Sequence, residues 1–303
     1  MCIIGLEKYY AYLTLIYLLP FEINNSSSFQ LINDHKNEDG SSASLLKNAL
    51  SNENRDQAFT LVIPAYNEES RIIPFLKDIY ENLPNDWEVI IVCDGMDRTA
   101  EICRSFGVRF NVLEFKNKLG KGGAILEGCS RAKGSVVGYA DADGALLSDE
   151  IIKVFGQVDE YNPVAIASRW VGGSEIIQRQ PIIRVILGRF YHYATFAILG
   201  LKQKDTQCGL KAFRRDAFDA VLNGVTLKTL SFDTAILYHC KLMNFKVLEV
   251  PVRWRDVGDS KVRPFITAMM MFAALIGLRL VHSSKTKKLR QIFSVLQETL
   301  SDI

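Results

Sequence analysis

The chain has 303 residues, of which 48% are hydrophobic and 23% charged, with 36 basic against 34 acidic side chains. This length suits one large domain or two small ones, and the apolar fraction excludes disorder throughout. A formal net charge of +2 gives no broad cationic field, so we expect no nucleic-acid partner, and any anionic ligand must be held locally.

The first 57 residues differ in composition from the rest of the chain. Residues 9–21 form an apolar run shorter than the ~20 residues that a spanning helix needs. That run suits a membrane-surface segment, a signal-like sequence or a docking helix, and a transmembrane span stays open. Residues 24–57 are rich in Asn, Ser, Asp, Glu and Lys, as in a linker. We therefore treat residues 1–57 as an N-terminal extension, partly apolar and then polar.

From Phe59 onward, short apolar runs alternate with segments of helical periodicity. Strands are expected at 59–63, 87–93, 108–115 and 135–140, and helices at 69–82, 99–106 and 122–132. Strands that are apolar on both faces and separated by helices predict a parallel sheet covered on both sides. The fold class is therefore α/β, and ligands are expected at the carboxyl ends of the strands.

Carboxylates follow three of these strands, at Glu68, at Asp94 and at the pair Asp141 and Asp143. Each alone is compatible with an ordinary turn or helix cap, but their coincidence at one edge of a sheet favours a site. Two carboxylates two residues apart suit Mg²⁺ or Mn²⁺ bound beside a diphosphate. Such an ion would stabilise negative charge on a leaving phosphate.

A glycine-rich segment, LGKGGA at residues 119–124, opens a predicted helix. Glycines allow close backbone approach and a helix N-terminus favours anions, so Lys121 and its neighbours are candidates for phosphate contact. The alternative is a tight loop that only places the helix. The spacing is not that of a P-loop, which excludes that class of phosphate site.

The chain resembles the inverting GT-A glycosyltransferases of family 2 in four ordered segments, which read VIPAYNE (62–68), VCDG (92–95), GKG (120–122) and DADG (141–144). Further segments are similar to the dolichyl-phosphate β-glucosyltransferases and, less closely, to the dolichyl-phosphate mannose synthases. These read DTQCGLK (205–211), FD (232–233), VPVRW (250–254) and GDSK (258–261). The resemblance covers about residues 59 to 282.

The resemblance implies a GT-A fold, a mixed, mainly parallel sheet with helices on both faces, over residues 58–262. A membrane-interfacial helix and a basic tail would follow over residues 263–303. It also implies an enzyme that transfers a hexose, most simply glucose from UDP-glucose, to dolichyl or another polyprenyl phosphate with inversion to a β-linked product. Its partners would be the nucleotide-sugar donor, the lipid phosphate and a membrane surface. The implied location is the cytoplasmic face of the ER or of an archaeal or bacterial plasma membrane, with peripheral or short-anchored attachment.

Site residues are implied by position within these segments. The nucleoside would lie near Pro64, Tyr66, Glu68 and Asp94, and the rest of the donor near Lys121, Asp141 and Ala142. Asp143 would bind the metal, and Arg169 and Lys261 would contact phosphate, as would Arg179, Arg184 and Arg214. Asp233 lies where many members place an acceptor-activating carboxylate, and here it would orient an arginine or the acceptor, or simply cap a helix.

Two residues depart from the family pattern, and both follow the second strand. Cys93 replaces a common first aspartate and Met96 replaces a serine, which puts base recognition by this segment in question. The chemistry itself follows from the acceptor. A lipid phosphate is ionised near neutral pH, so positioning and charge stabilisation should supply most of the acceleration without a strong general base.

Apolar character recurs near the C-terminus. Residues 265–278 contain no charged side chain, and as a helix they would reach ~21 Å, less than the ~30 Å hydrocarbon core. An interfacial or core helix is therefore expected, and residues 184–201 give a second candidate, for contact with the lipid acceptor. The basic residues at 285–290 suit anionic headgroups or a solvated helix face. His192 and His239 lie in apolar helical segments and are expected to be packed rather than to be ligands.

Three other functions were weighed. A polyprenyl-phosphate mannose or N-acetylglucosamine transferase would use the same motifs with a different donor. A non-catalytic sugar-nucleotide-binding membrane protein is suggested only by Cys93. A sugar nucleotidyltransferase would carry a glycine-rich signature near the first strand, where this chain has Pro64 to Glu68.

Overall fold

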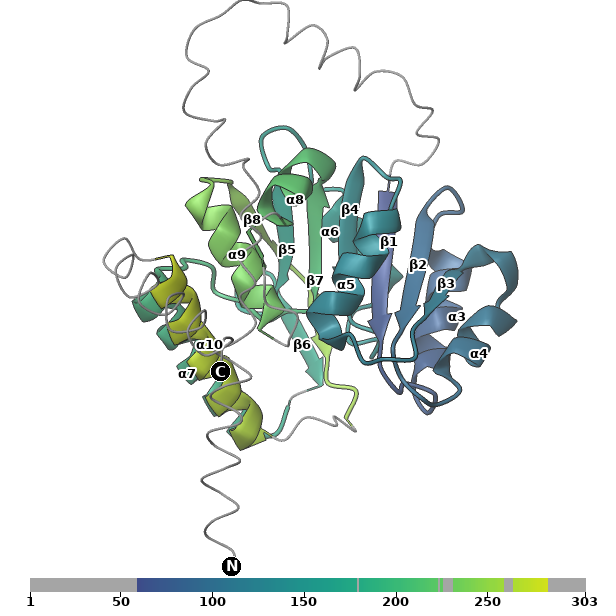
Figure 1. Ribbon diagram of the computed structural model, residues 1–303, viewed down its shortest axis with the longest axis horizontal. Helices are drawn as coiled ribbons and strands as arrows, with labels where there is room; N and C mark the ends of the chain where they lie inside the picture. The colour runs from purple at the N-terminus through teal and green to yellow at the C-terminus, as the bar shows by residue number, and fades with distance from the viewer. Residues whose placement is uncertain (1–58, 179, 223, 226–230, 259–263, 283–303) are drawn as a thin grey trace, which may run out of the picture. The chain divides into compact units, whose positions relative to one another are not determined.

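The computed structural model describes residues 59–178, 180–222, 224–225, 231–258 and 264–282, all within the unit Gln57–Ile303. They form a seven-stranded sheet of order β3-β2-β1-β4-β7-β5-β8 (Figure 1). Its strands are β1 (Phe59–Ala65), β2 (Glu88–Cys93), β3 (Asn111–Glu114), β4 (Val136–Ala140), β5 (Val164–Ser168), β7 (Leu210–Arg214) and β8 (Val247–Pro251). A second sheet pairs β6 (Glu175–Gln178) with β9 (Arg253–Arg255) in parallel.

The large sheet is mainly parallel, with one reversed strand. β1 pairs in parallel with β2 and β4, β2 with β3, and β5 with β8. β7 is antiparallel to both of its neighbours, β4 and β5. The predicted α/β class with a mixed, mainly parallel sheet is confirmed.

Helices cover both faces of this sheet (Figure 1). One face carries α3 (Ile72–Asn82), α4 (Thr99–Ser105) and α6 (Ser148–Phe155). The other carries α5 (Gly120–Arg131), α8 (Arg215–Leu222) and α9 (Phe232–Leu242). Two longer helices, α7 (Ile182–Leu199) and α10 (Pro264–Val281), lie side by side, with the rings of Phe190 and Phe272 stacked 6.3 Å apart.

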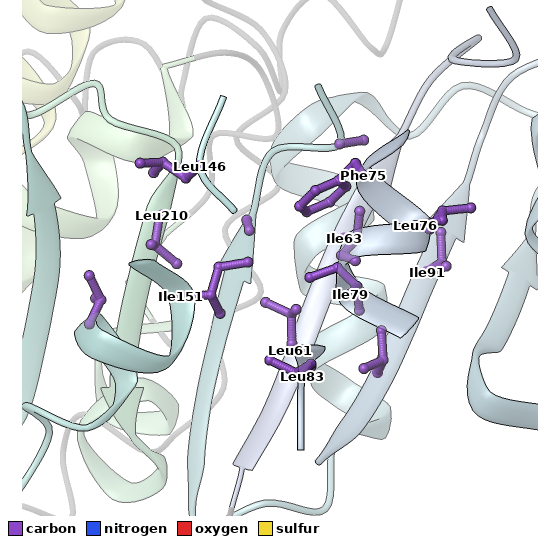
Figure 2. Close-up of a cluster of buried hydrophobic side chains, with 14 of the residues drawn as sticks. Leu61, Ile63, Phe75, Leu76, Ile79, Leu83, Ile91, Leu146, Ile151 and Leu210 are labelled. Carbon is purple, nitrogen blue, oxygen red and sulfur yellow. The ribbon is translucent and has the colours of Figure 1, made fainter. Parts of the chain in front are cut away.

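The two cores explain the unbroken apolar runs in the sequence. Successive side chains of a strand point to opposite faces, so Leu61 and Ile63 of β1 pack under α3 while Val62 packs under α5. Figure 2 shows the first of these clusters, where Leu61 and Ile63 meet Phe75 and Leu76. Because both faces are covered, a strand of this sheet has no polar side.

Several predicted boundaries differ from the observed ones, and two of the differences have a clear local cause. The strand expected at 108–115 is shortened to β3, because Gly107–Arg109 form a 3₁₀ turn and Gly107 has a left-handed φ of 76°. The helix expected at 265–278 is longer, since α10 begins at Pro264 and continues through Arg279 to Val281. Proline is well suited to the first turn of a helix, which accounts for the earlier start.

Gly138 in the middle of β4 gives a test of the packing between the sheet and α6. A methyl group there would overlap the carbonyl oxygen of Lys211 and the ring of Phe155. We expect Gly138→Ala to lower the free energy of unfolding by about 1 to 3 kcal/mol, as overpacking does. Gly188→Ala is the matched control, because its added methyl meets nothing within 4 Å and lies in α7. Equal effects of the two changes in urea unfolding would contradict the close packing at β4.

Candidate active site

Side-chain hydrogen bonds hold the segments that follow β1 and β2 in place. Oδ2 of Asp94 accepts hydrogen bonds from the backbone N–H groups of Leu119 and Gly120, at 2.8 and 2.9 Å. Asp94 is buried, and it fixes the start of α5. Oδ1 of Asn67 accepts a hydrogen bond from the N–H of Met96 at 2.9 Å. Gly95 is required here, because a Cβ would overlap Asn67.

The remaining residues expected near the nucleoside are divided between exposed and paired positions. Tyr66 is 40% exposed, and the ammonium of Lys118 lies 3.9 Å from its ring centroid. Glu68 is buried, and both of its carboxylate oxygens accept hydrogen bonds from Arg71. Pro64 is half-buried at the end of β1. Tyr66 therefore presents the surface that a base could stack on.

Cys93 packs away from this surface. It lies in the core beside Cys103 of α4, and its hydrogen bond to Cys103 together with burial raises the pKa of its thiol far above the usual range. Both cysteines are free thiols. Cys93, which stands where the family pattern has its first aspartate, therefore occupies a core position, whereas Met96 is almost fully exposed.

A buried cluster of charges joins β4, α5, β7 and α9. Asp233, in the first turn of α9, is 2% exposed and accepts hydrogen bonds from Lys211 at 2.5 Å and from the hydroxyl of Tyr139 at 2.8 Å. Its other oxygen lies 2.7 Å from Nζ of Lys121, which also lies 2.7 Å from Asp141. We call these five residues the Asp233 cluster.

The charges of the Asp233 cluster are mutually dependent. Burial would lower the pKa of Lys121, but the carboxylates of Asp141 and Asp233 raise it above its usual value. Burial would raise the pKa of Asp233, but Lys121 and Lys211 lower it. For Asp141 burial dominates, so its pKa is raised, and the neighbouring charge of Asp143 adds to this rise.

The Asp233 cluster gives two of the predicted site residues partners within the protein. Lys121, expected to touch a donor phosphate, is held between two carboxylates. Among the described residues, Asp233, expected to be catalytic, binds two lysines and a tyrosine and no arginine. Through Lys121 both residues position Asp141.

Arg169, directly after β5, is held by Asp205. Its guanidinium donates two hydrogen bonds to the Asp205 carboxylate, at 2.7 and 2.9 Å, and lies 5.3 Å from the Trp254 ring centroid. Asp205 also accepts from the backbone N–H groups of Gln207 and Cys208. Although burial opposes ionisation of the Asp205 carboxyl, Arg169 lowers its pKa. Arg169 is therefore a fixed cation.

A pocket of about 170 Å³ lies where these groups meet. It is bordered by Asp141, Asp143, Ala145, Leu146, Arg169, Gln180, Gln207, Cys208, Gly209 and Trp254. Carboxylates and a fixed guanidinium thus face one small space, as an anionic ligand with a bound cation would require. Ala142 is buried between the two aspartates and does not border the pocket.

The carboxylates of this pocket fit a hard divalent cation. One oxygen of Asp143 accepts a hydrogen bond from the N–H of Ala145 at 3.0 Å, and the charge of Asp143 raises the pKa of Asp141, so a cation would relieve their repulsion. Among the described residues, no group of three or more His, Cys, Asp or Glu side chains could hold a metal. Mg²⁺ is commonly held by one or two carboxylates with substrate phosphates completing its shell, so Asp143 with Asp141 suffices.

The other expected cations do not reach the pocket or lie outside the described residues. Arg214 was expected at a phosphate and is corrected. It pairs in register with Val136 at the opposite end of β4, and its guanidinium binds Asp216. Arg184 lies in the first turn of α7 and does not border the pocket. Arg179 and Lys261 fall outside the described residues.

Sequence reasoning missed Lys211, Tyr139 and Asp205 as parts of the site. Lys211 is fully buried in a strand that otherwise reads Leu210, Ala212 and Phe213. A lysine within such an apolar run needs a buried counter-ion, and this signal was available in the sequence.

The chain is similar in sequence to known proteins. The glycosyl transferase family 2 model matches residues 60–222. A dolichyl-phosphate β-glucosyltransferase of Trichomonas vaginalis is 34% identical over 233 residues, 71% of this chain and 68% of that protein. The Saccharomyces cerevisiae enzyme of the same name is 30% identical over 76% of this chain and 78% of its own length, and the human one 27% over 77% and 78%.

Solved structures share the fold. Glucosyl-3-phosphoglycerate synthase of Mycobacterium tuberculosis, in complex with Mn²⁺, UDP and phosphoglyceric acid, aligns with a TM-score of 0.55 at 16% identity. The alignment covers 81% of this chain and 84% of that chain. At this identity the likeness shows the GT-A fold alone.

The Asp233 cluster makes a prediction about stability. Asp233→Asn leaves Lys121 and Lys211 without their shared counter-ion, and we expect a loss of about 3 to 5 kcal/mol in the free energy of unfolding. Adding Lys211→Met to Asp233→Asn should recover part of this loss, because the uncompensated buried charge is removed. If denaturant unfolding shows the double variant to be less stable than Asp233→Asn alone, the two residues are not coupled as described.

Proposed function

Because the chain belongs to glycosyl transferase family 2, with the dolichyl-phosphate β-glucosyltransferases, we propose that it transfers glucose from UDP-glucose to dolichyl phosphate with inversion. It is a hexosyltransferase. The observation that carries the proposal is the pocket in which Asp143 and Arg169 border one space. Carboxylates there suit a divalent cation, and the fixed guanidinium suits a phosphate.

For the donor, we assign recognition of the base to the exposed ring of Tyr66 and of the diphosphate to Asp143 and Arg169. Bound Mg²⁺ or Mn²⁺, held by Asp143, would supply charge stabilisation at the diphosphate. Arg169 adds a positive charge that Asp205 keeps in place. Asp141, held by Lys121, borders the same pocket and is assigned to the ribose or the sugar.

For the acceptor, the buried state of Asp233 supports attack without a general base. Its carboxylate is 2% exposed and already accepts hydrogen bonds, so it is not available to take a proton from a substrate. A phosphate monoester needs no such group, because it is ionised near neutral pH. Positioning of the two substrates and stabilisation of charge supply the acceleration, and one displacement at the anomeric carbon inverts its configuration.

For the membrane, we assign the contact to α7 and α10. By length and composition, α7 is the one helix within the described residues that reaches the dimensions of a membrane span. It carries Arg184 and Arg189, which would be costly within a bilayer, so we place it at the surface. Its exposed apolar side chains, with those of α10, are Ile182, Ile183, Ile186, Phe190, Tyr193, Phe196, Met269, Ile276 and Leu280.

In this proposal the protein acts on the cytoplasmic face of a membrane. We assign residues 1–57 to an N-terminal extension, residues 58–262 to the catalytic domain, and residues 263–303 to an interfacial helix with a basic tail. The apolar run at 9–21 and the basic residues at 285–290 lie outside the described residues.

Donor choice is tested by offering UDP-glucose, UDP-N-acetylglucosamine and GDP-mannose to the purified chain with dolichyl phosphate and Mn²⁺. We expect lipid-linked product from UDP-glucose at a rate well above those from the other two. Product formed mainly from GDP-mannose or UDP-N-acetylglucosamine would replace glucose with that sugar in the proposal. No product from any donor would contradict the proposed transfer itself.

The role of Asp143 is tested by Asp143→Ala. We expect transfer to fall on the order of 100-fold or more, by loss of charge stabilisation at the diphosphate. Part of the loss should be recovered at high Mn²⁺ concentration, because Asp141 remains. Asp219→Ala removes an exposed carboxylate of α8 and should leave the rate unchanged. An Asp143→Ala rate equal to that of the unaltered chain at limiting metal would remove Asp143 from the metal site.

A further inference from the structure

A second hollow lies beside α7, and the proposed transfer does not use it. It encloses about 640 Å³ and is lined by Trp170, Val185, Arg189, His192, Tyr193 and Lys204. We call it the α7 groove. It shares no lining residue with the pocket of Asp143, although Trp170 and Lys204 are the chain neighbours of Arg169 and Asp205. A ligand in the α7 groove would thus lie near the active site and yet outside it.

Within the described residues, the cations of the α7 groove form no ion pair with an acidic side chain. The guanidinium of Arg189 lies 5.1 Å from the ring centroid of Trp170 and 5.5 Å from that of Tyr193. In the part of the chain that the structure describes, neither Arg189 nor the ammonium of Lys204 forms an ion pair. The nearby carboxylate of Glu249 is engaged, because it accepts the backbone N–H groups of Lys204 and Asp205. Two uncompensated positive charges therefore border one hollow.

His192 adds an unsatisfied polar atom to the same lining. Its Nδ1 is buried and has no hydrogen-bond partner among the described residues. Burial and the charge of Arg189 lower the pKa of His192, so the ring is neutral near pH 7. A ligand oxygen in the groove would satisfy Nδ1, while Arg189 and Lys204 would supply the charge.

The position of the α7 groove on the helix points to a lipid rather than a soluble anion. Val185, Arg189 and His192 follow one another at helical spacing and so share a face of α7. The exposed apolar side chains of Ile186 and Phe190 directly follow Val185 and Arg189 in the sequence and lie on the adjoining face. Cationic and apolar surfaces therefore meet along one helix, as a headgroup with its hydrocarbon chain requires.

We propose that the α7 groove binds the phosphate of an anionic bilayer phospholipid and so seats the active-site pocket against the membrane surface. Arg189 and Lys204 contact the phosphate, Trp170 and Tyr193 hold Arg189 in place, and α7 rests on the acyl chains. This inference depends on the membrane contact proposed above. The dolichyl phosphate that reacts is a different molecule, bound at the pocket.

The test measures flotation of the full chain with vesicles of phosphatidylcholine, with and without phosphatidylglycerol. We expect phosphatidylglycerol to increase binding. The variant Arg189→Gln with Lys204→Gln should lower the affinity for the anionic vesicles about tenfold, since each cation near an anionic surface contributes. Lys202→Gln with Lys246→Gln removes the same charge from two exposed lysines and should have a clearly smaller effect. The conservative pair Arg189→Lys with Lys204→Arg should retain binding.

Several outcomes would overturn the proposal. One is that phosphatidylglycerol does not increase vesicle binding of the unaltered chain. Another is that both double glutamine variants lose the same affinity for anionic vesicles, which would mean that only general surface charge acts. Thermal unfolding of each variant checks that a loss of binding is not a loss of folding.

Transfer in phospholipid-free detergent separates the bilayer lipid from the acceptor. Here Arg189→Gln with Lys204→Gln should leave kcat and the KM for dolichyl phosphate unchanged. A raised KM would assign the groove to the acceptor instead of the phospholipid. The unaltered chain could transfer no sugar and still bind anionic vesicles in a way that depends on Arg189 and Lys204. That result would contradict the proposed transfer and support the lipid site.

Discussion

A single buried carboxylate holds the active site together. Asp233 brings one charge into the protein interior and is stable there only because Lys121, Lys211 and Tyr139 surround it. These partners come from α5, β7 and β4, so the Asp233 cluster joins a helix on one face of the sheet to two neighbouring strands. Because Lys121 also forms an ion pair with Asp141, the position of Asp141 at the pocket depends on Asp233 as well.

The reversed strand β7 is what makes this arrangement possible. It lies between β4 and β5, which sets Lys211 opposite Tyr139 in register and brings the preceding loop back to the end of β4. Gly209 in that loop comes so close to Asp141 that a Cβ would overlap the carboxylate. The loop also contains Asp205, which fixes Arg169. The positions of Asp141 and Arg169 at the pocket thus both depend on the antiparallel direction of β7.

Much of the fold could be predicted, because local pattern determines it. The run 89–93 is apolar throughout, as expected of a strand that is covered on both faces. The site was harder, because the partners of a charge lie far apart in the sequence. Nothing in the sequence around Lys121 indicates that Asp233 lies against it. In the same way, nothing beside Asp94 indicates that the N–H groups of Leu119 and Gly120 bind its carboxylate. Arg214 was predicted to contact a phosphate, but it is the last residue of β7, which runs antiparallel to β4. It therefore lies beside the first residue of β4, at the end of the strands away from the pocket.

The chain between β5 and β7 leaves the sheet and returns to it at the same edge, since Ile166 and Lys211 are paired neighbours. Residues 169–209 are therefore an excursion whose two ends are fixed side by side, and it contains β6, α7 and Arg169. A segment anchored in this way can change in length or composition without disturbing the register of the strands that hold it. The excursion contains both Arg169 and its partner Asp205 as well as α7. A change within it would therefore act on the pocket and on the proposed membrane contact together, while the strands of the sheet stay paired.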